Sequence, residues 1–166
     1  MNLELVKNTD PVLKQLAEPF DFENPQYDPE ELAIALVDCM TRNGGIGLAA
    51  PQVGISLRVF AMASDPAFVC FNPKIVMPSE ETVLLDEACL SFPGLVIKIK
   101  RPKHVRFRFN GPDGETYTKT FTGMTARCVY HEVDHLDGRT FDTLANKIHL
   151  DVAKKKLIIN NRKLII

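Results

Sequence analysis

The sequence His131-Glu132-Val133-Asp134-His135 lies inside a helical pattern that begins at Met124, runs to about Asp137 and stops at Gly138. Residues four apart on a helix share one face, so both imidazoles can reach a single metal ion. Glu132, next to the first histidine, is then placed to take a proton from metal-bound water. The alternative is an exposed charged turn, but the spacing favours a metal site.

A metal site of this kind needs a third protein ligand. The downstream candidates are His149, Asp142 and Asp151. The better candidate lies upstream, where Cys89 stands in Glu87-Ala88-Cys89-Leu90-Ser91 just before a turn. A thiolate is a strong soft ligand, and a small neighbouring residue leaves its sulfur accessible. We therefore expect Cys89 to be the third ligand.

The overall composition is that of an ordinary globular protein. The chain has 166 residues, of which 45% are hydrophobic and 25% charged, which excludes disorder and coiled coil as the main state. Its net charge of −1 argues against bulk nucleic-acid binding. It contains no apolar run long enough for a membrane helix and no secretory signal at the N-terminus, so we expect a cytoplasmic protein. Cys39 and Cys70 are then expected to be buried free thiols.

The secondary-structure pattern predicts a single domain over residues 1–166 that mixes helices and strands. A helix is expected at about 28–42, with Asp28 as N-cap and a stop at Asn43-Gly44-Gly45. The acidic, proline-containing segment 18–31 before it is expected to be a surface loop. Short strands are predicted at 58–63, 67–71, 74–76, 95–100 and 105–109, the last forming a hairpin with 115–121.

Two segments allow alternative interpretations. The tail at about 150–166 can form a helix over 151–158 or a hairpin between 157–159 and 164–166, and we favour the helix. The stretch 98–108 carries six basic residues and no acid. It could be an RNA-facing patch, but the solvated face of two strands is the more common explanation for such a run.

A third segment of interest is Gly45-Ile46-Gly47-Leu48-Ala49-Ala50-Pro51-Gln52. It lacks the spacing of a nucleotide-binding loop. Its glycines would let the backbone approach a substrate closely, and Gln52 offers both a donor and an acceptor. Without a substrate role, the segment would be a flexible turn leading into a strand.

The segments 45–52, 87–91 and 131–135, in that order, resemble the three signature motifs of peptide deformylases. The resemblance extends from Thr9-Asp10-Pro11-Val12-Leu13 to about Asp142. Ala88 replaces the usual glycine before the cysteine, and Tyr130 replaces the usual glutamine before the first histidine. We expect Ala88 to be tolerated unless the backbone there has positive φ, and Tyr130 to point to a different helix face from the ligands.

The resemblance implies an α+β fold in which antiparallel or mixed β-sheets pack around a central metal-binding helix. It implies that Cys89, His131 and His135 hold one divalent ion, typically Fe²⁺, with Zn²⁺, Ni²⁺ or Co²⁺ also able to bind. Hydroxide on this ion would attack the formyl carbon, with Glu132 as general base. Gln52 and the backbone N–H of Leu90 match the positions that stabilise the oxyanion.

The implied substrate is the N-formyl-methionyl end of a newly made polypeptide, lying as an added strand beside Gly45–Gly47. Ile46, Met124 and Cys128 match positions of the methionine pocket. Glu87 and Arg101 match a pair that fixes the ligand loop. We expect a monomer whose partner is the nascent chain, without specific nucleic-acid or membrane binding; transient contact with the ribosome stays open.

Two other classes of function remain as alternatives. A small peptidase could use the same helix, but the cysteine motif and the glycine-rich segment would then have no role. A non-enzymatic protein could bind nascent chains or RNA through its basic strands. The presence of both Glu132 and Gln52 argues against it, because a binding protein needs neither side chain.

Overall fold

The computed structural model describes residues 1–64 and 67–163 and contains two antiparallel sheets. The larger sheet has the strand order β1-β2-β3-β6-β7, and the smaller one pairs β4 with β5. The strands are β1 (Gly47–Ala49), β2 (Val59–Met62), β3 (Phe68–Pro78), β4 (Thr82–Ala88), β5 (Val96–Pro102), β6 (His104–Asn110) and β7 (Thr116–Thr122). The helices are α1 (Pro29–Arg42), α2 (Gly123–Leu136), α3 (Phe141–Leu144) and α4 (Lys147–Lys163). The predicted α+β class is confirmed.

Helix α1 begins and ends as its sequence predicts. The side chain of Asp28 accepts a hydrogen bond from the backbone N–H of Glu31 at 2.9 Å, and Pro29 occupies the first turn. Gly44, just beyond the helix, has a φ of +67°. The apolar stripe that includes Leu32, Leu36 and Met40 is buried against one face of the larger sheet.

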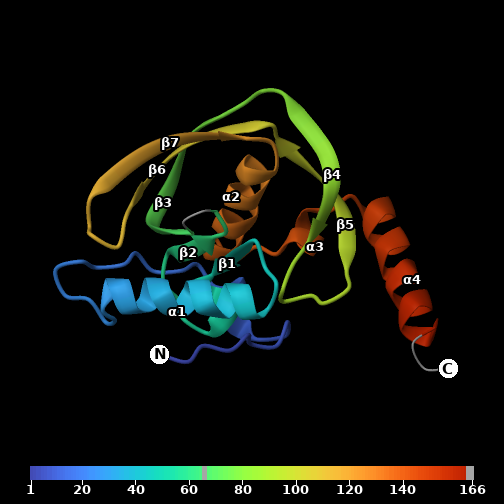
Figure 1. Cartoon of the computed structure of the whole chain (residues 1–166). Helices are drawn as coiled ribbons and strands as arrows, with labels where there is room; N and C mark the ends of the chain where they lie inside the picture. The colour runs from blue at the N-terminus through green and yellow to red at the C-terminus, as the bar shows by residue number, and fades with distance from the viewer. Residues whose placement is uncertain (65–66, 164–166) are drawn as a thin grey trace.

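Helix α2 lies between the two sheets (Figure 1). Strand β2 shows how the larger sheet separates its two helices, because alternate side chains point to opposite faces. Val59 and Ala61 join the core beside α1, whereas Phe60 and Met62 join the core beside α2. The metal-binding helix predicted at the centre of the fold is therefore α2.

The smaller sheet covers the other side of α2, and α4 lies on the outer side of β5 (Figure 1). Ile97 and Ile99 of β5 are buried in a third core that includes Phe141 and Ala153. Leu157 of α4 packs so closely over the turn before β5 that a Cβ added to Gly94 would lie 2.9 Å from it. The C-terminal helix thus supports the strand that follows the Cys89 loop.

Two strand predictions were wrong. The strands predicted at 67–71 and 74–76 are one strand, β3, which begins at Phe68, because Asn72 takes a φ of +49° at an irregularity in the ladder rather than ending it. The Asn72 side chain bonds the backbone N–H and C=O of Phe20 at 2.7 and 2.9 Å, which holds the acidic N-terminal loop against the sheet. Strand β4 was not predicted at all.

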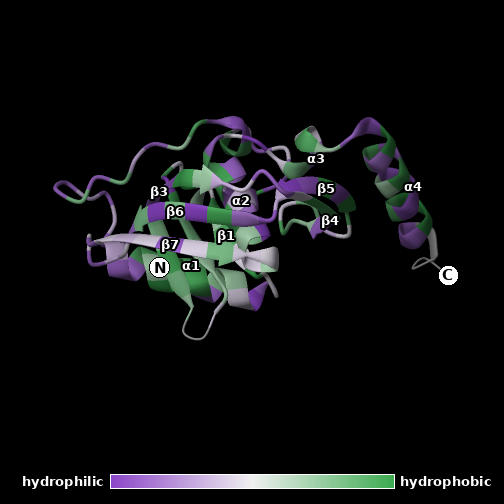
Figure 2. Ribbon diagram, turned by 90° about the horizontal axis from the view of Figure 1, so that it is seen from above, coloured by the Kyte–Doolittle hydropathy of each residue, from purple (hydrophilic) through white to green (hydrophobic). Residues whose placement is uncertain are grey.

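The tail forms α4 over Lys147–Lys163, so the helix was the correct alternative and the hairpin was not. The residues of the hairpin's second half, 164–166, lie outside the described residues. Hydrophilic and hydrophobic residues alternate along α4 (Figure 2). In the described part of the chain, we find no helix with the length and apolar character needed to cross a membrane.

Candidate metal centre and active site

Helix α2 presents two neighbouring stripes of side chains to the space between the sheets. Arg127, His131 and Asp134 recur at i, i+4 and i+7, and each bonds a side chain of the β4–β5 pair. Cys128 and Glu132 lie one residue further on and line a cleft beside that sheet. Arg127 and His131 line the same cleft, so this face of α2 both holds the smaller sheet and borders the cleft.

Three of the predicted ligands meet at this place. The donor atoms of Cys89, His131 and His135 lie within 4.8 Å of one another, and all three residues are buried. Cys89 Sγ and His135 Nε2 are 3.2 Å apart. The other downstream candidates, His149, Asp142 and Asp151, are not part of this group. Among the described residues this is the one cluster of histidine, cysteine and acidic side chains that could hold a metal ion.

The orientation of His131 is fixed from behind by Glu87. His131 Nδ1 donates to Glu87 Oε2 at 3.0 Å, which leaves Nε2 free to face the other two donors. Arg101 donates to both oxygens of Glu87, at 2.8 and 3.0 Å, and also to Asp134. The predicted Glu87–Arg101 contact is present, and the carboxylate orients an imidazole in the way that metal-ligating histidines require.

Burial and charge set the protonation of this cluster. Burial alone would raise the pKa of Glu87, but the hydrogen bond from His131 and the contact with Arg101 lower it to about 2. Burial lowers the pKa of His135 to about 3, which keeps its ring in the neutral form that binds metal ions. Burial raises the pKa of Glu132 to about 7. A carboxyl group with a pKa near neutrality can both accept and return a proton.

Glu132 is buried beside the three donors, and its Oε2 has no hydrogen-bond partner among the described residues. A buried polar atom without a partner is costly, so this oxygen needs water or substrate next to it. Together with the soft and imidazole donors, the unpartnered oxygen fits a metal ion that carries water. The residues present therefore suit the group that the motif predicts.

Gln52 lies in the short 3₁₀ turn Ala50–Val53 that follows β1. Its Oε1 accepts from the backbone N–H of Ala49 at 2.9 Å, which fixes the orientation of the amide. Its Nε2 therefore points to Cys89 Sγ at 3.5 Å and to Ser91 Oγ at 3.1 Å. The predicted oxyanion donor thus aims an N–H at the cysteine of the cluster.

The two glycines before Gln52 are needed for space rather than for flexibility. A Cβ on Gly47 would lie 2.2 Å from Glu132 Oε1 and 2.7 Å from Cys128 Sγ. A Cβ on Gly45 would lie 2.6 Å from Leu90 Cδ1. The backbone at Gly45 and Gly47 therefore runs directly against side chains that lie beside the cluster.

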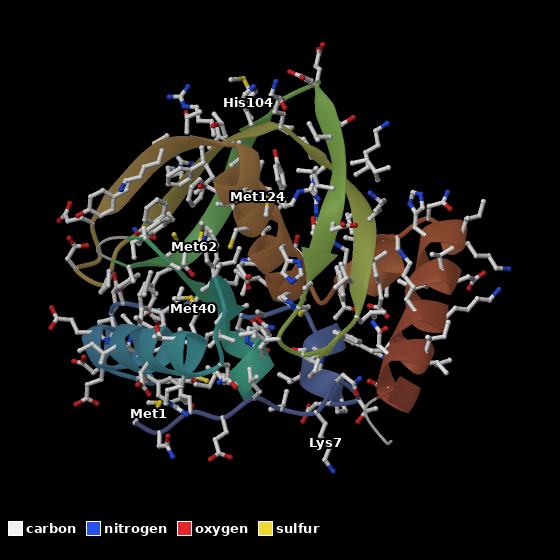
Figure 3. The ribbon with its side chains drawn as sticks, turned by 45° about the vertical axis from the view of Figure 1, so that its right-hand side comes forward. Met1, Lys7, Met40, Met62, His104 and Met124 are labelled. Carbon is white, nitrogen blue, oxygen red and sulfur yellow. The ribbon has the colours of Figure 1, made fainter. Side chains whose placement is uncertain are left out.

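An open cleft of about 640 Å³ leads to the cluster. Cys89, Leu90 and Glu132 line this cleft. All the residues predicted to contact the substrate line it as well, namely Gly45, Ile46, Gly47, Met124 and Cys128. Met124 projects from the first turn of α2 (Figure 3) and is 53% exposed, while Ile46 is 59% exposed. Large apolar side chains this exposed offer an apolar group a place to bind.

Both departures from the usual motifs are accommodated. Ala88 lies at the end of β4, and Asn72 is the one non-glycine residue with positive φ in the described ranges, so no glycine is required at 88. Tyr130 packs into the core between α2 and the larger sheet, and its hydroxyl donates to the backbone oxygen of His104 at 3.1 Å. It faces away from the cluster, as expected.

Sequence reasoning missed the roles of Arg127 and Asp134. Both are buried and bonded to the smaller sheet, Arg127 through Glu87 and Asp134 through Arg101. Their position at i−4 and i+3 from His131 places them on its helix face, and this spacing was the signal that could have found them. The basic run 98–108 is solvated at Lys98, but its Arg101 is buried.

The chemistry of these donors narrows the class of protein. Two imidazoles and a thiol suit zinc or a first-row transition metal, and a buried glutamate beside them is a group that can activate water. Such a centre at the end of an open cleft, on an H-E-x-x-H helix, is typical of metal-dependent hydrolases.

Comparison with known proteins supports this class and makes it specific. The family model for polypeptide deformylase matches residues 2–149, and the chain belongs to this family. It is 38% identical over 149 residues to a peptide deformylase of Pseudothermotoga lettingae, covering 90% of this chain and 86% of that one. It is 35% identical over 162 residues to peptide deformylase 1B, chloroplastic/mitochondrial, of Arabidopsis thaliana, covering 93% of this chain and 58% of that one.

Solved structures agree with the sequence comparison. A peptide deformylase from Synechococcus elongatus in complex with actinonin superposes with a TM-score of 0.84 at 33% identity, covering 93% of this chain and 85% of that one. A class I type b peptide deformylase from Acinetobacter baumannii with Met-Ala-Ser bound superposes with a TM-score of 0.81 at 35% identity, covering 87% of this chain and 98% of that one. As a member of this metal-dependent family, the chain is a hydrolase that removes the N-formyl group from newly made polypeptides.

Proposed function

We propose that Cys89, His131 and His135 hold one divalent ion, Fe²⁺, and that the chain uses it to remove formate from the formyl-methionine at the start of new polypeptides. The observation that supports this most strongly is the approach of the three donor atoms to within 4.8 Å of one another, at a cleft that Glu132 also lines. When bound, such an ion supplies Lewis acidity and makes water a nucleophile at neutral pH. The same donors suit Zn²⁺, Ni²⁺ and Co²⁺.

Glu132 is the general base in this proposal. It accepts a proton from the attacking water and returns it to the leaving amine, which requires a carboxyl group with a pKa near neutrality. Its buried and unpartnered Oε2 and its pKa of about 7 both support this role. Because the amine departs with that proton, the products are formate and a free methionyl N-terminus.

Gln52 and the backbone N–H of Leu90 stabilise the oxyanion that forms on the formyl carbon. The bond from Ala49 N–H to Gln52 Oε1 supports this role, because it prevents the amide from turning its oxygen toward developing negative charge. Leu90 directly follows the cysteine and lines the same cleft, so its backbone is close to the reacting carbon.

The substrate peptide lies in the cleft as an added strand. Strand β1 is at one edge of the larger sheet, and residues of β1 and β4 both line the cleft, so backbone groups from two sheets are available to an extended peptide. The methionine side chain contacts Ile46, Met124 and Cys128. The Met-Ala-Ser peptide bound to the Acinetobacter baumannii relative supports a cleft of this kind.

We further propose that residues 1–166 form one catalytic domain that acts as a cytoplasmic monomer, because a single chain supplies every group of the site. Its partner is the N-terminus of a nascent chain, and transient binding to the ribosome would bring the enzyme close to that N-terminus. We propose no specific nucleic-acid or membrane partner.

Metal content of cysteine variants tests the proposed centre. Cys89→Ser should lose most of its bound metal, because a neutral hydroxyl is a far weaker ligand than a thiolate. Cys70→Ser is the matched control, since Cys70 is a buried free thiol in the core between α2 and the larger sheet. Elemental analysis after anaerobic loading measures both. Full occupancy in Cys89→Ser would exclude this cysteine as the third ligand.

A further inference from the structure

Arg127 is a buried arginine that joins α2 to both strands of the smaller sheet. Its Nη1 donates to Glu87 Oε1 at 2.7 Å and to the backbone oxygen of Ile99 at 2.9 Å. Its Nη2 donates to the backbone oxygen of Val83 at 2.7 Å. One side chain therefore fixes three points of the β4–β5 pair, two of them on the main chain.

These points bear directly on the proposed metal centre. Cys89 directly follows β4, so its sulfur is placed by the smaller sheet, whereas His131 and His135 are placed by α2. The three donors come together only if the sheet sits at one position on the helix. We infer that Arg127 is a positioning residue that sets this separation and so determines how tightly the site binds its metal ion.

The other ion pairs between the smaller sheet and α2 do not reach the main chain of the strands. Arg101 reaches from β5 to Asp134 of α2, and Glu87 reaches from β4 to His131, but both contacts depend on side chains at each end. Arg127 instead grips main-chain oxygens of two strands, and the planar guanidinium holds its acceptors in a fixed geometry. It is therefore the contact that resists sliding of the pair along the helix.

The charge balance indicates that Arg127 can be removed without unfolding the protein. The ion-pair network around Arg127 contains three carboxylates, Glu87, Asp134 and Asp137, and four arginines, Arg58, Arg101, Arg127 and Arg139. Without Arg127 the charges are equal in number, and Glu87 still bonds Arg101 and His131. Loss of Arg127 therefore leaves neither Glu87 nor Asp134 without a partner.

The test uses Arg127→Met, which keeps an unbranched apolar stem but donates no hydrogen bond, and Arg127→Lys, which keeps the positive charge but loses the planar guanidinium with its several donors. Arg42→Met is the matched control, because Arg42 also donates to a carboxylate, Asp38, and to a backbone oxygen, that of Leu3, within a separate contact. Co²⁺ affinity is measured by competition with a chelator, and the thiolate-to-cobalt absorption band reports on Cys89. Thermal unfolding of each loaded variant is recorded alongside.

We expect Arg127→Met to bind Co²⁺ about 10–100-fold more weakly, as loss of a group that orients metal ligands commonly does. The thiolate-to-cobalt band of Arg127→Met should shift or weaken. The Co²⁺ affinity of Arg127→Lys should lie between those of Arg127→Met and the wild type, and the affinity of Arg42→Met should equal that of the wild type. Wild-type affinity with an unchanged band in Arg127→Met would overturn the inference. If Arg127→Met does not fold, Arg127→Lys decides: weaker binding at an unchanged melting temperature supports the inference, and wild-type affinity overturns it.

This inference rests on the proposed metal centre, and the experiment separates the two. Absence of the thiolate band in the wild-type protein would contradict the centre itself. A normal band in the wild type that Arg127→Met leaves unchanged would contradict only the role of Arg127.

Discussion

At the residue scale, the site depends on how little room surrounds Glu132. Gly47 has no side chain, and this allows the Glu132 carboxylate and the Cys128 thiol to lie against the backbone of β1. Burial then raises the pKa of the carboxyl group to about 7. The ability of Glu132 to act as the proposed general base therefore depends on the close packing that raises its pKa as well as on the carboxyl group itself.

Glu132→Gln tests the general base. The amide has nearly the same shape but cannot accept the proton, so turnover should fall about 10²–10⁴-fold while bound metal stays at the wild-type level. Formate release and metal content are measured on the same preparation. Turnover close to wild type in this variant would rule out the proposed role of Glu132.

Gly47→Ala tests the packing around it. The added methyl would lie 2.2 Å from Glu132 Oε1, so the carboxylate must move, and we expect kcat to fall about 10²-fold because small displacements of catalytic groups are costly. Gly45→Ala is the control, since its methyl would lie 2.6 Å from Leu90 Cδ1, the end of a side chain that can rotate away, and 3.3 Å from the backbone oxygen of Gly47, but it would not meet Glu132. Equal losses in the two variants would show that the position of Glu132 is not what Gly47 protects.

At the element scale, the helices and strands of this chain differ in how far the sequence predicts them. Helix α1 carries a clear N-cap and an apolar stripe, the HExxH helix carries its motif and ends before a glycine of positive φ, and the β6–β7 hairpin carries a clear turn. All three were therefore predictable. Strand β4 was not, because Leu84 and Leu85 are adjacent and both exposed, which removes the alternation expected of a half-buried strand.

The site residues that stand in known sequence motifs were predictable, and those whose role depends on being buried were not. Cys89, Glu132 and the two histidines stand in recognisable motifs. Arg127 lies outside these motifs, and Asp134 occupies a variable position of H-E-x-x-H. Their spacing from His131 puts them on its helix face, but a buried charged residue on a helix has the same sequence pattern as a solvated one. Only the fold reveals that they face the smaller sheet.

Gly94→Ala tests the contact between α4 and the turn that follows Cys89. Gly94 has a φ of +76°, and its added methyl would lie 2.9 Å from Leu157 Cδ1, so the variant carries both backbone strain and a clash. Gly123→Ala, at a φ of +61° with no atom within 4 Å of its methyl, carries the strain alone, about 1–2 kcal/mol. Denaturant unfolding should show a larger loss for Gly94→Ala.

A double variant isolates the clash. Leu157→Ala removes the side chain that the new methyl would meet, so in the Gly94→Ala background it should cost less than it does alone, with a coupling of about 0.5–3 kcal/mol. Strictly additive losses would mean that Leu157 does not press on Gly94.

At the scale of the whole molecule, the cleft is a property of two sheets that share one helix. The larger sheet supplies β1 with Gly47, the smaller one supplies Cys89 directly after β4, and α2 supplies the histidines and the glutamate. No single element contains the site. The alternatives of a general peptidase and of a binding protein could share this helix, but membership of the polypeptide deformylase family argues against both.

Formate release from formyl-Met-Ala-Ser by the anaerobically Fe²⁺-loaded protein is the most direct test of the account. We predict stoichiometric formate and intact Met-Ala-Ser from the formylated peptide, and no reaction of acetyl-Met-Ala-Ser. Cleavage of internal peptide bonds would instead identify a peptidase. Absence of formate from a protein that has bound its metal would contradict the central claim.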